Sequence, residues 1–174
     1  MDQAHVVVLG DANVDLLVKL PGGPTDQAPS PQHVPPELHG GGTSANVAVG
    51  LSRLGVPVAF AGALGDDNYG RWVREDLIAE GVDVRGLHRV ADEFTVMVMA
   101  LIQPDGERLI YVWPPTGGAH LQIVPTDILL DIWPQARWLH TSGICLRGEP
   151  ARSTILGSMA QARRLGWSVS IDLN

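Results

Sequence analysis

The chain has 174 residues with 12 basic and 19 acidic side chains, giving a net charge of −7, and 45% of its residues are hydrophobic. This length and hydrophobic content indicate about one folded domain, and the acidic balance argues against a nucleic-acid partner or an anionic membrane. The single cysteine, Cys145, excludes an internal disulfide, and the first residues do not resemble a signal peptide, so we expect a cytoplasmic protein without a membrane partner.

The chain begins with two apolar runs that are followed by a segment rich in proline. Val6–Leu9 is a short, continuous apolar run, which is typical of a strand buried on both faces of a parallel sheet. A second run, Val14–Leu20, follows closely. Residues 21–36 contain six prolines and no helical or strand period, so they predict a surface loop or an edge element.

A glycine run then introduces the first predicted helix. Thr43 or Ser44 could cap this helix at its N-terminus, and Gly55 could end it. The helix carries several small side chains, which favours close packing against a sheet. Val58–Ala63 follows and predicts the next buried strand.

The middle of the chain combines one more helix with a predicted hairpin. The helix begins with Asp67 or Asn68 as a cap and ends near Gly81. Thr95–Ile102 and Arg108–Trp113 have the composition of strands and are separated by a short loop that contains glycine. This pattern indicates a β-hairpin that interrupts the alternation of strands and helices.

The last third predicts a return to alternating elements. We expect a helix over 126–132, a strand over 138–141, a helix from Pro150 to Leu165 and a strand over 168–173. A buried parallel strand requires a covering helix after it, and no such helix follows the last predicted strand. The pattern therefore suggests the N-terminal part of a longer α/β protein.

Two polar side chains follow the first predicted strand. Asn13 and Asp15 lie in the segment GDANVD, and ligands of open α/β sheets bind beyond the carboxyl ends of the strands. A carboxylate in that position could accept hydrogen bonds from two neighbouring hydroxyl groups of a sugar. The alternative is an Asx turn that only ends the strand.

The glycine run is a second candidate binding element. Gly41 and Gly42 would let a ligand approach backbone N–H groups, and Asn46 in the first helical turn offers a donor and an acceptor. The alternative is a flexible connection that leads into a capped helix.

Other common site patterns are weak or absent. Gly40, Gly42 and Ala45 match a dinucleotide-binding fingerprint, with Asp66 at about the expected distance, but no strand immediately precedes them. The only lysine, Lys19, lies outside any P-loop pattern. The six histidines show no paired spacing, so no metal site is predicted.

Taken in order, these segments resemble a known family. VVVLGDANVD, GGGTSANVAVGLSRLG, GALGDDNYG, LHTSGI and SIDLN resemble the N-terminal half of a ribokinase-like (PfkB-type) carbohydrate kinase. The resemblance implies an α/β fold with a central, mostly parallel sheet flanked by helices, and a small β-sheet lid from about 14–39 and 95–113. It also implies that Asp15, Gly41, Gly42 and Asn46 bind sugar hydroxyls and that Asn13 supports Asp15.

The same resemblance implies a function that this chain carries only in part. Family members use ATP and Mg²⁺ to phosphorylate a sugar, and their catalytic aspartate and nucleotide pocket lie in the C-terminal half. We therefore expect 1–174 to supply the sugar-binding half, with no catalytic residue of its own. A homodimer formed through the lid is a further expectation. The alternative is a non-catalytic module that binds a carbohydrate or a nucleoside.

Overall fold

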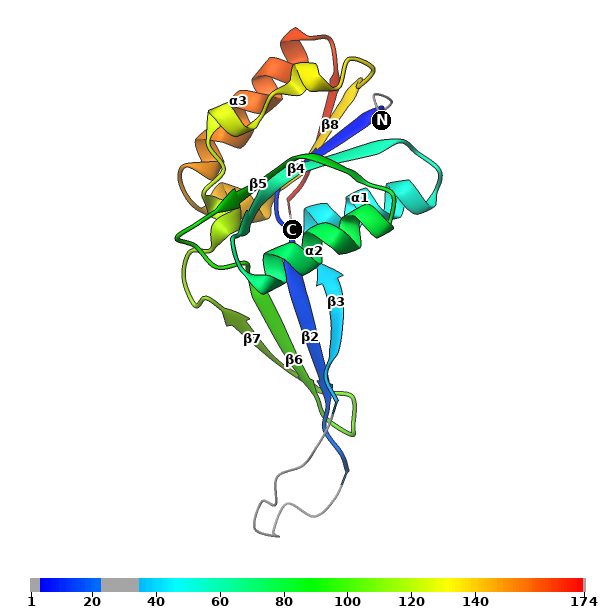
Figure 1. Cartoon of the computed structure of the whole chain (residues 1–174), viewed down its shortest axis with the longest axis vertical. Helices are drawn as coiled ribbons and strands as arrows, with labels where there is room; N and C mark the ends of the chain where they lie inside the picture. Colours follow the sequence, from blue (N-terminus) through cyan, green and yellow to red (C-terminus); the bar gives the residue numbers. More distant parts are fainter. Residues whose placement is uncertain (1–3, 23–34, 174) are drawn as a thin grey trace.

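Two β-sheets are joined end to end in the computed structural model, which describes residues 4–22 and 35–173 (Figure 1). The strands are β1 (Val6–Leu9), β2 (Asn13–Lys19), β3 (Glu37–Gly41), β4 (Val58–Gly65), β5 (Asp83–Val90), β6 (Met97–Ile102), β7 (Arg108–Trp113), β8 (Trp138–Ser142) and β9 (Ser168–Asp172). The α-helices are α1 (Thr43–Arg53), α2 (Asn68–Ala79) and α3 (Ala151–Arg164). Four 3-10 helices are η1 (Ala119–Leu121), η2 (Pro125–Asp127), η3 (Leu130–Ile132) and η4 (Gly143–Arg147).

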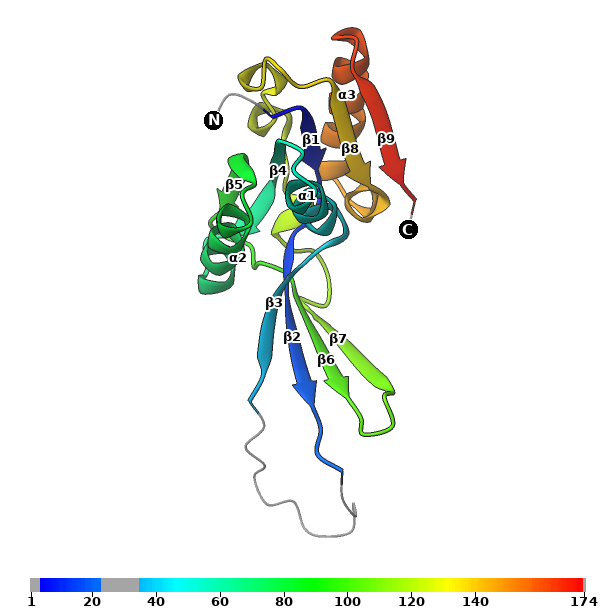
Figure 2. The same cartoon turned by 90° about the vertical axis from the view of Figure 1, so that its right-hand side faces the viewer.

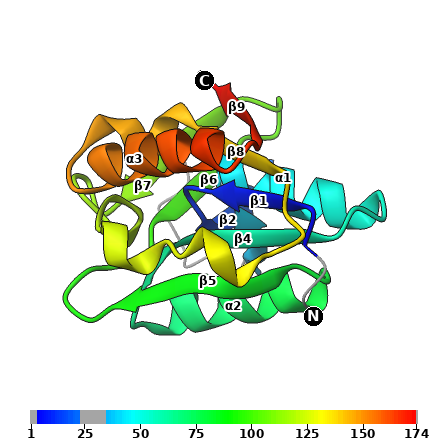
Figure 3. The same cartoon turned by 90° about the horizontal axis from the view of Figure 1, so that it is seen from above.

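The larger sheet is parallel throughout, with the strand order β5-β4-β1-β8-β9. Helices α1 and α2 cover one face, and α3 covers the other (Figure 2 and Figure 3). Helices on both faces require strands that are apolar on both faces, which explains why β1 and β4 are continuous apolar runs. The predicted α/β fold with a mostly parallel sheet is confirmed.

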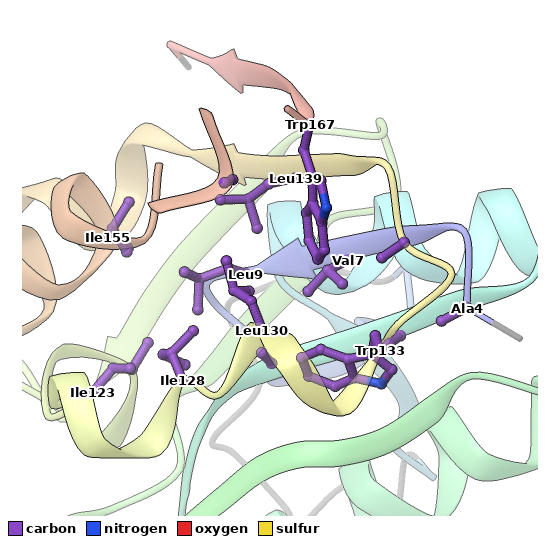
Figure 4. Packing of buried hydrophobic residues seen from close by; sticks show 14 of the residues in the cluster. Ala4, Val7, Leu9, Ile123, Ile128, Leu130, Trp133, Leu139, Ile155 and Trp167 are labelled. Atoms are coloured by element: carbon purple, nitrogen blue, oxygen red, sulfur yellow. The ribbon is translucent and has the colours of Figure 1, made fainter. Parts of the chain in front are cut away.

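Alternate residues of the central strands point into two separate hydrophobic cores, one on each face of the large sheet. Val7 and Leu9 point toward the α3 side, where they pack with Trp133 and the buried Trp167 (Figure 4). Phe60 belongs to the cluster under α1 and α2. All of these side chains except Trp167 are fully shielded from solvent. Burial on both sides fixes the register of the strands, because a shift by one residue would exchange the two cores.

The smaller sheet has the order β3-β2-β6-β7 and projects away from the larger one (Figure 1). Strand β2 pairs antiparallel with β3 and parallel with β6, and β6 and β7 form the predicted hairpin. Its four strands come from the two segments, 14–39 and 95–113, that were expected to form a lid. Residues 23–34 of the proline-rich segment lie outside the described residues.

The structure corrects the predicted helices and strands in two places. The helix expected over 126–132 is wrong: the segment forms the short η2 and η3 instead, bounded by Pro125 and Pro134. Strand β5 was not expected, because its sequence mixes charged and apolar residues. Within the described residues, no helix combines the length and the hydropathy needed to cross a membrane.

One polar contact ties η3 to the edge strand β5. The indole Nε1 of Trp133 donates a hydrogen bond to Asp83 Oδ2 at 2.9 Å, and Arg85 forms an ion pair with the same carboxylate at 2.7 Å. Burial alone would raise the pKa of Asp83, but the hydrogen bonds from Arg85 and Trp133 outweigh it, so the pKa is lowered. The carboxylate therefore stabilises the folded state in its charged form.

Candidate functional site

A cavity of about 570 Å³ lies between the large sheet and the small sheet. Residues of the β1–β2 connection, β2, β6, η1 and η4 line it, together with the start of α1. From β1 the chain adds β4 and then β5 on one side of the sheet, and from β8 it adds β9 on the other side. The direction of the strand order therefore reverses between the neighbours β1 and β8. Ligands of open α/β sheets bind at such a switch point, and the volume is in the usual range for a small-molecule site.

Asn13 and Asp15 line this cavity as the first residues of β2, with one side chain supporting the other. The amide Nδ2 of Asn13 donates a hydrogen bond to Asp15 Oδ1 at 2.5 Å. Burial raises the pKa of Asp15, although the hydrogen bond from Asn13 and the charge of His39 oppose this. Among the described residues, no side chain or backbone group donates to Asp15 Oδ2, so that oxygen is available to a hydroxyl group of a ligand.

Gly41 and Gly42 sit where larger residues would collide with their neighbours. A Cβ atom on Gly41 would lie 2.5 Å from Asp15 Oδ1 and 2.6 Å from Asn13 Nδ2. Gly42 has a φ of +101°, and its Cβ would lie 2.7 Å from the backbone of Ala12. Gly42 lines the cavity, whereas Gly41 lines a neighbouring cavity of about 370 Å³ that is bordered by β3, α1 and α2. Gly41 therefore gives the Asn13–Asp15 pair its space and does not form a wall of the main cavity.

Asn46 completes the set of expected residues and lies between the two cavities. It is exposed, it belongs to the first turn of α1, and it lines both spaces. Its amide provides donors and an acceptor for a neutral polar ligand. Four of the five expected residues, Asn13, Asp15, Gly42 and Asn46, thus line one cavity.

The sequence analysis missed Asp11, which organises the start of α1. Its Oδ2 accepts a hydrogen bond from the backbone N–H of Thr43 at 2.7 Å. Its Oδ1 accepts hydrogen bonds from the N–H and Oγ of Ser44 at 3.2 and 2.8 Å, and from Ser142 Oγ at 2.7 Å. The expectation that Thr43 or Ser44 caps the helix is wrong: Gly42 holds the cap position, and the carboxylate comes from a residue distant in sequence.

Two further residues of the cavity wall were also missed. His120 in η1 and Arg147 at the end of η4 both line the cavity. A signal for Arg147 was present in the sequence, because it follows a predicted strand at the sheet edge where ligands bind. His120 gave no such signal, since η1 is a short 3-10 turn in an irregular segment.

Known proteins resemble this chain over most of its length. Residues 3–166 match the pfkB family carbohydrate kinase. The chain is 37% identical to a fructokinase of Escherichia coli over 98% of its own length and 51% of that protein. It is 36% identical to an aminoimidazole riboside kinase of Salmonella typhimurium over 97% of its length and 48% of that protein. The chain thus spans about half the length of the curated relatives that it matches.

Solved structures show the same fold. A fructokinase from Xylella fastidiosa superposes with a TM-score of 0.84 and 25% identity, covering 97% of this chain and 52% of that one. An uncharacterized sugar kinase from Pyrococcus horikoshii, solved in complex with ATP, superposes with a TM-score of 0.79 and 25% identity, covering 97% and 53%. With its family match, its relatives and its ribokinase-like fold, the chain belongs to the pfkB family of carbohydrate kinases.

Proposed function

We propose that this chain forms the sugar-binding half of an ATP-dependent kinase that transfers a γ-phosphoryl group to a sugar hydroxyl. The observation that carries the proposal is the Asn13–Asp15 pair in the 570 Å³ cavity beneath the small sheet. A carboxylate held by a neighbouring amide is suited to accept hydrogen bonds from hydroxyl groups. In this role the small sheet acts as a lid over the bound sugar.

The residues of this chain would bind and orient the acceptor sugar. Asp15 accepts hydrogen bonds from the sugar, Asn13 holds the Asp15 carboxylate in place, and Asn46 adds donors and an acceptor from the start of α1. Positioning of this kind lowers the barrier to phosphoryl transfer by fixing the acceptor close to the phosphate. We assign no catalytic base to this chain.

The nucleotide side of the reaction is assigned to the other half of a complete kinase. Within residues 4–22 and 35–173, no group of three or more histidine, cysteine or acidic side chains could hold a metal ion. In this proposal ATP and Mg²⁺ bind mostly to the other half of the kinase. ATP is the ligand of the related Pyrococcus horikoshii structure.

The direct test is the variant Asp15→Ala, with sugar affinity measured by titration calorimetry on the purified chain. Hydrogen bonds to a charged group contribute about 1.5–3 kcal/mol, so the affinity should fall about 10- to 100-fold. Asp131→Ala removes an exposed carboxylate outside the cavity and serves as the control. Equal sugar affinity in the wild type and Asp15→Ala would exclude Asp15 from the site.

A second test separates the kinase from a non-catalytic binding module. The existence of an aminoimidazole riboside kinase among the relatives extends the candidate ligands of such a module to nucleosides. The 174-residue chain should show no ATP consumption with a panel of sugars, because only the acceptor side of the reaction is present. Supplying the missing half of a family kinase should restore turnover if the chain is part of an enzyme. Turnover by the chain alone that is lost in Asp15→Ala would show that a catalytic base lies within it.

We further propose that the lid forms a homodimer. Strand β7 is an edge strand of the small sheet, and all of its residues are exposed, including Ile110 at 62% and Tyr111 at 57%. An exposed apolar edge strand favours pairing with a second copy. Sedimentation velocity at micromolar concentration should show a dimer that Ile110→Lys dissociates. A wild-type monomer in the presence of sugar would refute the dimer.

A further inference from the structure

The sugar cavity contains a positive charge that a neutral sugar would not require. Arg147 is the last residue of η4, and η4 directly follows the carboxyl end of β8. The exposed side chain of Arg147 lines the cavity. Among the described residues, its guanidinium takes part in no hydrogen bond or ion pair. A guanidinium presents a planar set of donors that matches the oxygens of a carboxylate or a phosphate.

The acidic side chains of the cavity form no ion pair with Arg147 among the described residues. The Asp11 carboxylate accepts hydrogen bonds from Thr43, Ser44 and Ser142, and the Asp15 carboxylate accepts one from Asn13. These donors are neutral, so both carboxylates keep their charge, but neither carboxylate occupies the guanidinium of Arg147.

His120 does not compete with Arg147 as a cation. Burial lowers the pKa of His120, and the nearby charge of Arg147 acts in the same direction, against a raising effect from Asp11. At neutral pH the imidazole is therefore uncharged. The effect of Arg147 on His120 also indicates that the guanidinium lies close to this wall of the cavity, and η1 and η4 are in contact there.

The cavity thus has two walls of different chemistry. Asn13 and Asp15 from β2, with Asn46 from α1, suit hydroxyl groups, whereas Arg147 from η4 suits an oxyanion. We propose that Arg147 forms an anion subsite and that the acceptor is an acidic sugar, whose carboxylate binds Arg147 while its hydroxyls bind Asp15. This inference rests on the proposed sugar-binding function and names the class of sugar.

The test compares a neutral and an acidic sugar at constant ionic strength. D-Fructose and D-gluconate are titrated into the wild-type chain and into Arg147→Met, Arg147→Lys and the control Arg164→Met, which removes an exposed arginine on α3. Gluconate should bind about 10-fold or more tightly than fructose to the wild type, because a charge-assisted hydrogen bond is stronger than a neutral one. Arg147→Met should abolish this preference by weakening gluconate binding far more than fructose binding, and Arg147→Lys should restore part of it.

Three results would overturn the inference. Equal binding of gluconate and fructose to the wild type would show that the cavity does not select an anion. An unchanged preference in Arg147→Met, with an unchanged melting temperature, would remove Arg147 from the subsite. Binding of inorganic phosphate as tightly as gluconate, with the same loss in Arg147→Met, would assign the subsite to a phosphoryl group instead of a sugar carboxylate.

The outcome also separates this inference from the proposed function. If fructose binds and Asp15→Ala weakens it while gluconate gains nothing from Arg147, the sugar-binding function stands and the acidic sugar is excluded. If neither sugar binds to the wild type, both proposals fail together. Binding of gluconate that requires both Asp15 and Arg147 would support both.

Discussion

Removing the carboxylate of Asp11 should destabilise the fold more than any other single change at the cavity. Asp11 is buried, and its two oxygens accept hydrogen bonds from two backbone N–H groups of α1 and from the hydroxyls of Ser44 and Ser142. In Asp11→Ala, the two hydroxyls still contact each other at 3.1 Å, but the N–H groups of Thr43 and Ser44 lose their hydrogen bonds to Asp11.

The expected cost follows from these contacts. The N–H of Ser44 would become an unsatisfied buried donor, which costs about 1–3 kcal/mol. The partly buried N–H of Thr43 would lose a hydrogen bond to a charged group, which contributes about 1.5–3 kcal/mol, against a total stability of about 5–15 kcal/mol. Asp11→Asn keeps one oxygen but turns an amide NH₂ toward the N–H of Thr43, and should cost about 1–3 kcal/mol. Ser142→Ala removes one hydroxyl and should cost about 0.5–1.5 kcal/mol.

Urea unfolding monitored by tryptophan fluorescence measures these three values on the purified chain. The free energy of unfolding should fall in the order Ser142→Ala, Asp11→Asn, Asp11→Ala, with the largest loss in the last. Calorimetry on the variants that remain folded should also show weaker sugar binding, because Asp11 holds the start of α1, which carries Gly42 and Asn46. Three variants with the stability of the wild type would refute the role of Asp11 as the remote cap of α1.

Three further predictions concern other parts of the fold. Lowering the pH from about 7 to about 3 should destabilise the wild type more than Asp83→Asn. The pKa of Asp83 is lowered in the folded state, so the stability that its charged carboxylate contributes is lost as the pH falls through that pKa. Equal losses of unfolding free energy in urea for the two proteins would contradict this. Gly50 and Gly157 lie in helices, and a Cβ atom at either position would meet open space. Gly50→Ala and Gly157→Ala should therefore each stabilise the folded state by about 0.5–1 kcal/mol, measured as a higher melting temperature. Gly41→Ala should displace Asp15 and weaken sugar binding in calorimetry, and an unchanged affinity would show that the pair adjusts freely.

The pattern of apolar residues was sufficient to predict those helices and strands in which buried residues recur regularly along the sequence. The apolar runs of β1 and β4 predicted buried strands. Of the two expected caps of α2, Asp67 and Asn68, Asp67 holds the position and accepts a hydrogen bond from the N–H of Gly70 at 2.7 Å. Strand β5 was missed because it lies at the edge of the sheet and alternates buried with exposed residues. The expected helix over 126–132 failed because Ile128, Leu130 and Trp133 enter the core from an irregular path.

The candidate site was predictable only where it lies in local motifs. Asp15 and Gly42 stand in short segments with a recognisable spacing, so the sequence indicated them directly. The bonds of Asp11 to α1 and to Ser142 join residues far apart in the chain, and no local pattern carries that information. The place of Arg147 after a predicted strand indicated the ligand-binding edge of the sheet, but Arg147 lines this cavity because β8 lies beside β1, which only the sheet order shows.

The position of β1 between β4 and β8 has a consequence for synthesis of the chain. Strand β4 and both segments of the small sheet leave the ribosome before β8 and α3, so β1 first acquires only one of its two neighbours. At that stage the face formed by Val7 and Leu9 has no cover from α3, and the other edge of β1 is open. Unpaired edges and apolar faces of this kind attract chaperones and promote aggregation. Ribosome-bound chains stalled after β7 should therefore be the species that depends most on chaperone binding.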